Sequence, residues 1–277
     1  MLVNSYKIIQ KIGSGNFSQV FLGEHKKDPD KKAAVKIGQP NDTSIAHESR
    51  ILRHLNMELP SMIADYVPTL FWYGRFGTNQ LSMTMTYYPL SLESYIHESN
   101  INTIFSQILS IISYIHSVGI LHRDIKLDNF MIKIENDEEH IVLIDFGFAC
   151  YVDSVFESTD HLVGTPNYTS YFLYEGNPYS RRDDLISTLY LFMELSGIQW
   201  PWNSTDADNL ITTMKKSGLA LNHRLHERNQ VRAYYKKKDY LTHYLMSFPV
   251  LSTFVENLYS LELDEKPEYV KYIDLFQ

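Results

Sequence analysis

The stretch that decides the fold is His122-Arg-Asp-Ile-Lys-Leu-Asp-Asn129, followed further along the chain by Asp145-Phe-Gly147. Asp124 can orient a hydroxyl group and accept its proton. Asn129 can supply an amide oxygen, and Asp145 a carboxylate, to a magnesium ion, because magnesium prefers hard oxygen ligands. An oriented nucleophile, a divalent metal and a cation on the phosphates are what phosphoryl transfer needs. The stretch therefore predicts a site for that chemistry.

Two lysines are candidates for the cation. Lys36 lies inside the apolar run Ala33–Ile37, where an ammonium group is costly unless it meets an anion. Glu48 follows in a stretch with helical spacing, and a Lys36–Glu48 pair would hold the ammonium against nucleotide phosphates. A lysine that snorkels from an edge strand is the alternative reading. Lys126 can neutralise charge on the transferred phosphoryl group.

A glycine-rich turn near the N-terminus joins two predicted strands, in the stretch Ile12-Gly-Ser-Gly-Asn-Phe-Ser-Gln-Val20. Glycines at 13 and 15 let the backbone approach phosphate oxygens, since no Cβ intervenes. The turn is not a Rossmann fingerprint, because a strand follows it, and it lacks the Gly-Lys-Ser/Thr ending of a Walker A loop. Taken alone, it also fits a tight hairpin.

Hydrophobic patterning separates a strand-rich start from a helix-rich remainder. Apolar runs between polar turns predict strands at Tyr6–Ile12, Val20–Glu24, Ala33–Ile37, Leu81–Thr86, Phe130–Ile134 and Ile141–Ile144. Asp28-Pro29-Asp30 suits a hairpin loop over His25–Lys32. Apolar residues at helical spacing predict a helix over Ile101–Ser117, and Leu185–Leu195 is apolar enough for a buried helix. The composition change near Tyr87–Ser91 predicts a hinge.

Composition excludes several classes of protein. The 277 residues are 44% hydrophobic and 21% charged, which is typical of a globular chain. Cys150 is the single cysteine, so an intrachain disulfide framework is excluded. A net charge of −8 argues against a general nucleic-acid binder. We expect no membrane span, since no apolar run reaches ~18 residues. Without a signal-peptide pattern, we expect a reducing compartment, cytoplasm or nucleus.

The order of glycine-rich loop, strand lysine, helix glutamate, His-Arg-Asp and Asp-Phe-Gly resembles the eukaryotic-type protein kinases over nearly the whole chain. The resemblance implies one α+β, bilobal kinase domain over residues 1–277. A small antiparallel-sheet N-lobe would span about 1–86, a hinge about 86–90, and a larger, mainly helical C-lobe 91–277. ATP and Mg²⁺ are the implied cofactors. The implied partners are protein substrates with serine or threonine acceptors, and the implied oligomeric state is a monomer.

The resemblance also implies site residues. Asp124, Lys126, Lys36 and Glu48 would be catalytic, and Asn129 and Asp145 would hold the metal. The implied nucleotide contacts are Ile12, Gly13, Ser14, Gly15, Asn16, Phe17, Ser18, Val20, Ala34, Lys36, Met85, Thr86, Tyr88, Met131 and Ile144. Met85 would be the gatekeeper. Thr165 would bond to Asp124 and Lys126, and Asp184 would brace the catalytic-loop backbone.

Four strings are similar to the casein kinase 1 family: Lys11-Ile-Gly-Ser-Gly15, Asp128-Asn-Phe130, Ser180-Arg-Arg-Asp-Asp-Leu185 and Glu265-Lys-Pro-Glu-Tyr269. Where most protein kinases have Ala-Pro-Glu, this chain has Ser170-Tyr171-Phe172, and casein kinase 1 enzymes also lack that glutamate. Arg181, Arg182 and the basic stretch Lys215–Lys238 would favour acidic or already phosphorylated substrates. A solvated helix face is the alternative for the basic stretch.

The chain departs from the family in its activation segment, which carries no Lys or Arg between Phe148 and Val163. Ser154, Ser158 and Thr159 are candidate phosphosites there. Because no long C-terminal tail follows the Lys-Pro-Glu-Tyr match, we expect a constitutively active serine/threonine kinase. A pseudokinase scaffold would lack Lys36, Asp124 or Asp145, and none is missing. A small-molecule kinase is the third alternative, against which Lys126 and Thr165 argue.

Overall fold

The computed structural model describes residues 1–15, 18–60, 64–96, 101–136, 138–154, 162–205, 207, 209–210, 213 and 227–277. Internal contacts divide the chain into two units. Unit 1 comprises Met1–Tyr95 and Asp128–Ala149, and unit 2 comprises Ile96–Leu127 and Cys150–Gln277. The chain therefore returns to unit 1 at Asp128, within the stretch His122–Asn129, and each unit is built from two segments.

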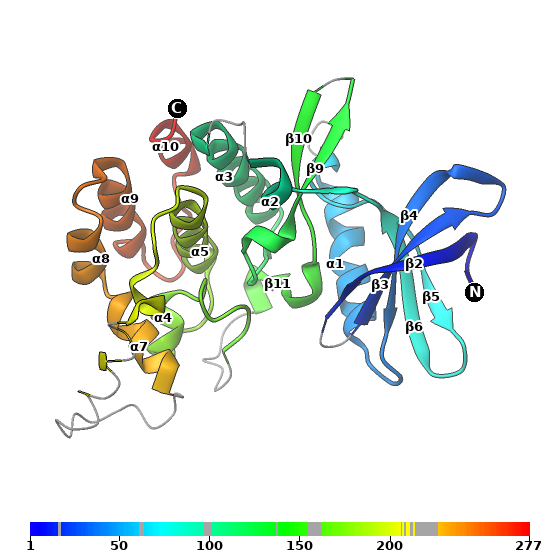
Figure 1. The fold of residues 1–277 in the computed structure, drawn as a ribbon, viewed down its shortest axis with the longest axis horizontal. Coiled ribbons are helices and arrows are strands. Elements are labelled where there is room, and N and C mark those ends of the chain that lie inside the picture. Colours follow the sequence, from blue (N-terminus) through cyan, green and yellow to red (C-terminus); the bar gives the residue numbers. More distant parts are fainter. Residues whose placement is uncertain are drawn as a thin grey trace. The chain divides into compact units, whose positions relative to one another are not determined.

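A six-stranded antiparallel sheet dominates unit 1 (Figure 1). In the order β1-β2-β3-β4-β6-β5 it contains β1 (Leu2–Val3), β2 (Tyr6–Ser14), β3 (Ser18–His25), β4 (Asp28–Gly38), β6 (Gln80–Thr86) and β5 (Leu70–Phe76). Val3, Val35 and Ile37 form a buried cluster on the sheet, and Tyr6 and Trp72 pack against it. The four strands predicted in this region are confirmed. β5 was not predicted, because its Gly74 and Arg75 interrupt the apolar pattern.

The hairpin between β3 and β4 is tighter than the sequence suggested. A loop over His25–Lys32 was predicted, but β4 already begins at Asp28, so that prediction is wrong in its extent. His25 pairs with Asp28 and Glu24 with Lys32, and the register shift between these pairs forms a bulge. Pro29 is tolerated there, because a bulge does not require every N–H to donate to the ladder.

The rest of unit 1 surrounds one helix and a second, small sheet. Helix α1 (Ser44–Glu58) buries Ile45, Ile51, Leu52 and Leu55 and packs on β4, β5 and β6. The second sheet has the order β10-β9-β7, from β7 (Leu90–Ser91), β9 (Phe130–Glu135) and β10 (Glu138–Leu143). The shorter elements are η1 (Ala64–Tyr66), α2 (Leu92–Tyr95), η3 (Leu127–Asn129) and η4 (Phe146–Phe148). Strands β9 and β10 form an antiparallel hairpin and confirm the strands predicted at Phe130–Ile134 and Ile141–Ile144.

Unit 2 is mainly helical. Its helices are α3 (Ile101–Ser117), α4 (Tyr171–Tyr174), α5 (Arg181–Leu195), α7 (Glu227–Tyr235), α8 (Lys238–Tyr244), α9 (Pro249–Tyr259) and α10 (Tyr269–Asp274). Short elements are β8 (Ile120–Leu121), β11 (Cys150–Tyr151), η5 (Val152–Ser154) and η6 (Pro201–Asn203). Helix α3 has the predicted bounds. None of the helices in the described part of the chain combines the length and apolar character needed to cross a membrane.

The core of unit 2 forms where α3, α5, α9 and α10 pack together. The Phe105 ring lies 4.7 Å from Phe192 and 4.6 Å from Phe276, both edge to face. Helix α5 is buried along nearly its whole length, as predicted for Leu185–Leu195, but it starts earlier, at Arg181. A capping box between Ser180 and Asp183 sets that start, because each side chain satisfies a backbone N–H of the first turn.

Candidate active site

The strand lysine is bound by two carboxylates within unit 1. Lys36 Nζ lies 2.7 Å from Glu48 Oε2 on α1 and 2.8 Å from Asp145 Oδ1. Burial alone would lower the pKa of Lys36, but the charges of Glu48 and Asp145 outweigh it and raise the pKa above its usual value. The ammonium group is therefore held charged. The predicted Lys36–Glu48 pair is confirmed, and the snorkelling alternative is wrong, because Lys36 is 8% exposed.

Asp145 reaches Lys36 through a special backbone conformation. Its φ is +62° and ψ +73°, in the left-handed region that a non-glycine residue adopts at some cost. It precedes η4, which packs against α1. A Cβ added at Gly147 would lie 3.3 Å from Asp145 Oδ1, so the glycine leaves room around this carboxylate.

The two candidate metal ligands lie at one end of the β9–β10 hairpin. Ile144 N donates to Asn129 O at 2.9 Å, which continues the pairing of Phe130 with Leu143. Asn129 thus belongs to this hydrogen-bonded pair, and Asp145 directly follows its other member, Ile144. The Asp145 side chain is 43% exposed. Carboxylate and amide oxygens form a donor set that fits a divalent ion such as Mg²⁺.

All described residues predicted to contact a nucleotide belong to unit 1. They lie on strands β2, β3, β4, β6 and β9 or next to β2, β6 and β10. These residues are Ile12, Gly13, Ser14, Gly15, Ser18, Val20, Ala34, Met85, Thr86, Tyr88, Met131 and Ile144. Asn16 and Phe17 lie outside the described residues. Gly15 N donates to Ser18 O at 2.9 Å and closes the turn between β2 and β3. These contacts with a nucleotide stay predictions.

A second polar cluster, in unit 2, surrounds Asp124, which is 4% exposed. Lys126 Nζ lies 2.8 Å from Asp124 Oδ2. Thr165 Oγ1 donates to Asp124 Oδ1 at 2.7 Å and accepts from Lys126 Nζ at 3.1 Å. The contacts predicted for Thr165 are therefore confirmed. The three side chains fix one another, and the carboxylate is oriented at both oxygens.

Gly164 brings Thr165 to Asp124. Its φ is +89°, and a Cβ there would lie 2.4 Å from Arg123 O and 3.5 Å from Asp124 Oδ1. Real Cβ atoms do not approach a carbonyl oxygen so closely. The glycine is therefore required both by its backbone conformation and by the close approach of the two segments.

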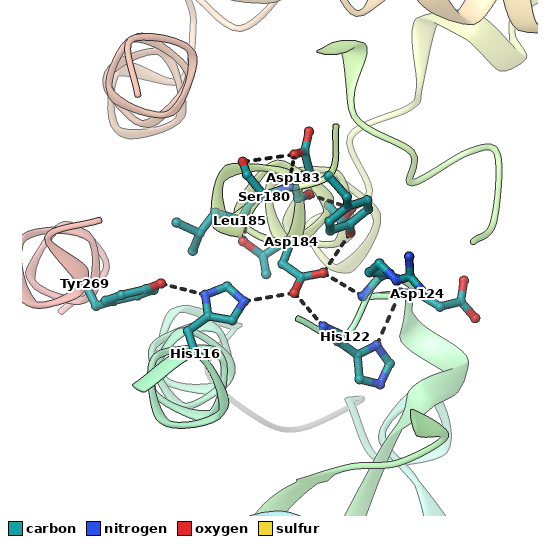
Figure 2. A network of polar contacts seen from close by, with 12 residues as sticks. His116, His122, Asp124, Ser180, Asp183, Asp184, Leu185 and Tyr269 are labelled. Carbon is teal, nitrogen blue, oxygen red and sulfur yellow. Dashed lines mark hydrogen bonds and ion pairs between the residues drawn. The ribbon is translucent and has the colours of Figure 1, made fainter. Parts of the chain in front are cut away.

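Asp184, at the start of α5, holds the backbone that presents Asp124 (Figure 2). Asp184 Oδ2 accepts from His122 N at 2.8 Å, and Oδ1 accepts from Arg123 N at 2.9 Å. Arg123 has a φ of +66°, so these bonds stabilise a conformation that is costly for an arginine. The bracing predicted for Asp184 is confirmed.

The chain matches a protein-family model. The model described as "Protein kinase domain" matches residues 6–261. The chain belongs to the protein kinase domain family. The α+β fold predicted from the sequence is confirmed by this match together with the sheet-rich and helical regions described above. A kinase is a transferase, and this domain implies the use of ATP and a divalent metal with protein substrates.

Sequence reasoning missed three groups that hold Asp184 in this kinase. His116 Nε2 lies 2.9 Å from Asp184 Oδ2, and His116 Nδ1 lies 2.6 Å from Tyr269 OH (Figure 2). Tyr179 OH donates to Asp184 Oδ1 at 2.8 Å. Burial lowers the pKa of His116, so its neutral ring donates from Nε2 and accepts at Nδ1. The only sequence signal was a histidine on the apolar face of α3.

Arg182, which was predicted to contact substrate, is buried in this kinase. It is 6% exposed, its Nη1 donates to Leu261 O at 2.9 Å, and its guanidinium lies 3.4 Å from the centre of the Phe172 ring. These contacts give Arg182 a packing role, and its contact with substrate stays a prediction. Arg181 is only partly buried, and its substrate contact stays a prediction. Residues 215–226 of the basic stretch, with Ser158 and Thr159, lie outside the described residues.

Proposed function

We propose that this kinase is an ATP- and magnesium-dependent serine/threonine protein kinase of the casein kinase 1 type. The observation that carries the proposal is the binding of Lys36 by both Glu48 and Asp145. A lysine–glutamate ion pair and the aspartate of Asp-Phe-Gly must both be in place for a protein kinase to act. A pseudokinase scaffold would not need to keep all three groups.

In the proposed reaction, a substrate hydroxyl oxygen bonds to the γ-phosphorus of ATP as the bond to the β-phosphate oxygen breaks. Asp124 orients the hydroxyl and accepts its proton, and ADP leaves. Lys36 carries positive charge for the α- and β-phosphates, and Lys126 stabilises the phosphoryl group in transfer. Asn129 and Asp145 would hold a bound Mg²⁺, which would neutralise charge on the phosphates.

Serine/threonine specificity is supported by the cluster around Asp124. Lys126 is two residues from Asp124, and Thr165 binds both of their side chains. The Asp-x-Lys form resembles that of serine/threonine kinases. The four strings similar to casein kinase 1 support the subfamily, and the presence of Phe172 in place of the usual glutamate agrees with it.

The test compares phosphate transfer from labelled ATP to a serine peptide and to the same peptide with tyrosine. We expect labelling of the serine peptide, little of the tyrosine peptide, and none with EDTA. Asp124→Asn and Asp145→Asn should each abolish transfer. Asp128→Asn is the matched control, because Asp128 is an exposed carboxylate on the same loop. A folded, ATP-binding wild type that labels neither peptide would favour the scaffold.

We also propose that activity does not require phosphorylation of the activation segment. The backbone of His122 and Arg123 is held by Asp184, without a phosphate group. Phosphatase treatment should therefore leave the rate of peptide phosphorylation unchanged. A several-fold fall would show that a modified residue, such as Ser154, takes part.

A further inference from the structure

Lys236 is a fully buried lysine at the end of α7. Its exposed fraction is 0%, and it forms no ion pair with a carboxylate in the described part of the chain. Burial of a lysine without a counter-ion is costly, so other groups must replace water around its nitrogen. Burial and the nearby charge of Arg232 lower the pKa of Lys236 well below its usual value.

The partners of Lys236 are three backbone carbonyl groups of one short segment. Nζ donates to Pro166 O at 3.2 Å, to Asn167 O at 2.7 Å and to Thr169 O at 2.7 Å. An ammonium group has three donor hydrogens, so the number of acceptors matches it. The nitrogen also lies 4.4 Å from the ring centre of Tyr190 and 4.5 Å from that of Trp202, at the distance of a cation–π contact.

The other two carbonyl groups of segment 165–169 are also bound inside unit 2. Tyr168 O accepts from Ser187 Oγ at 2.7 Å. Thr165 O accepts from the backbone N–H groups of Tyr168 and Thr169, at 2.9 and 3.1 Å. The segment therefore has its carbonyl oxygens turned into the unit, and Lys236 satisfies three of them from a single atom.

We propose that Lys236 is a positioning residue for the substrate-side loop: it fixes segment 166–169 and, through it, Thr165. Thr165 Oγ1 in turn binds Asp124 and Lys126. Loss of the Lys236 side-chain nitrogen would leave three carbonyl groups with fewer donors and let the loop move, whereas Lys36, Glu48 and Asp145 belong to unit 1. The effect should fall on the protein substrate and not on ATP. This step rests on the proposed function.

The first test needs neither a variant nor activity. In the wild type, hydrogen exchange at the amides of Tyr168 and Thr169 should be as slow as in the adjoining helix α7, because the segment is held at both ends. If these amides exchange as fast as unprotected ones, the proposal is wrong. This measurement tests the proposal even if no kinase substrate is found.

The second test uses Lys236→Met, with Lys271→Met as the matched control, because Lys271 is an exposed lysine of the same unit. We expect KM for a serine peptide to rise at least about tenfold, which is the effect of one lost hydrogen bond. The Kd for ATP should stay within about twofold, since the phosphate-side contacts are unchanged. Exchange should quicken at 165–169 and not in β3 or β4.

Two results would overturn the proposal. One is an unchanged peptide KM and unchanged exchange in Lys236→Met. The other is an equal loss of ATP binding, peptide binding and exchange protection throughout the chain, which would show that Lys236 supports only global stability. Local loss of exchange protection with no kinase activity in the wild type would instead leave the positioning role standing and refute the proposed function.

Discussion

Asp184→Asn is the change that most directly tests how the catalytic loop is held. Each carboxylate oxygen of Asp184 accepts two hydrogen bonds: Oδ1 from Arg123 N and Tyr179 OH, Oδ2 from His122 N and His116 Nε2. An asparagine has the same shape but offers one acceptor oxygen and one NH₂ group. Whichever way the amide turns, the NH₂ group faces two donors.

The cost follows from what the neighbours can do. Next to the NH₂ group, His116 can change tautomer or Tyr179 can rotate its hydroxyl, but a backbone N–H cannot adapt. One N–H, of His122 or of Arg123, therefore stays unsatisfied at about 1–3 kcal/mol, and the remaining bonds lose their charge assistance at about 1 kcal/mol each. Relief from burying a charge offsets part of this sum. We expect a net loss of about 2–4 kcal/mol from the free energy of unfolding.

The activity should fall as well, because the released N–H lies next to Asp124. The left-handed backbone of Arg123 relaxes when its hydrogen bond to Asp184 is lost, and Asp124 is then displaced. A displacement that raises the activation free energy by about 1.4–2.8 kcal/mol lowers kcat about 10- to 100-fold. Urea unfolding and peptide phosphorylation measure the two effects. Tyr179→Phe is the control, since it removes one bond from the same carboxylate and frees no backbone group; it should cost about 1 kcal/mol. If Asp184→Asn matches wild type in both assays, the bracing argument is wrong.

Three further outcomes are expected. Lys36→Met should lower kcat about 10²–10³-fold, since it removes a preorganised cation, and a phosphorylation assay measures this. Gly164→Ala should destabilise the chain and lower activity far more than Gly176→Ala in the same two assays, because both glycines have positive φ but only Gly164 would press a Cβ on Arg123 O, at 2.4 Å. His116 should make the free energy of unfolding fall as pH drops below about 6.5, because the unfolded state then gains a proton that buried, neutral His116 resists, whereas Asp183, whose pKa burial raises to about 6, should oppose this fall. Urea unfolding from pH 7.5 to 5 should show this slope, and His116→Gln should reduce it.

The residues that the sequence identified best are those that lie together in short strings. Asp124, Lys126 and Asn129 share one loop, so their order and spacing already carry the chemistry. Lys36 and Glu48 were harder to pair, because only the packing of α1 on β4 brings them to 2.7 Å. Asp145 joins the same lysine through a left-handed backbone that no pattern of residue types reveals.

The sequence failed where partners come from distant segments. Arg182 was predicted to contact acidic or phosphorylated substrates, whereas in the structure it is buried against Phe172 and the carbonyl of Leu261. Lys236 was read as part of a basic surface. Both cases have one physical cause. A long, charged side chain can bind backbone carbonyl groups and aromatic rings, and a count of charged residues in the sequence does not reveal these acceptors.

The division of the chain adds a consequence for how the motif works. Asp124 and Asn129 lie five residues apart and read as one string, yet Asp124 belongs to unit 2 and Asn129 to unit 1. The separation arises because β9 pairs with β10 and β7, while η4 packs on α1, so residues Asp128–Ala149 belong to unit 1. The backbone at Leu127 therefore joins Asp124, the proposed proton acceptor, to Asn129, the proposed metal ligand. A substitution at Asn129 should then alter the stability of unit 1, whereas one at Asp124 should alter that of unit 2, and hydrogen exchange in each unit separates the two.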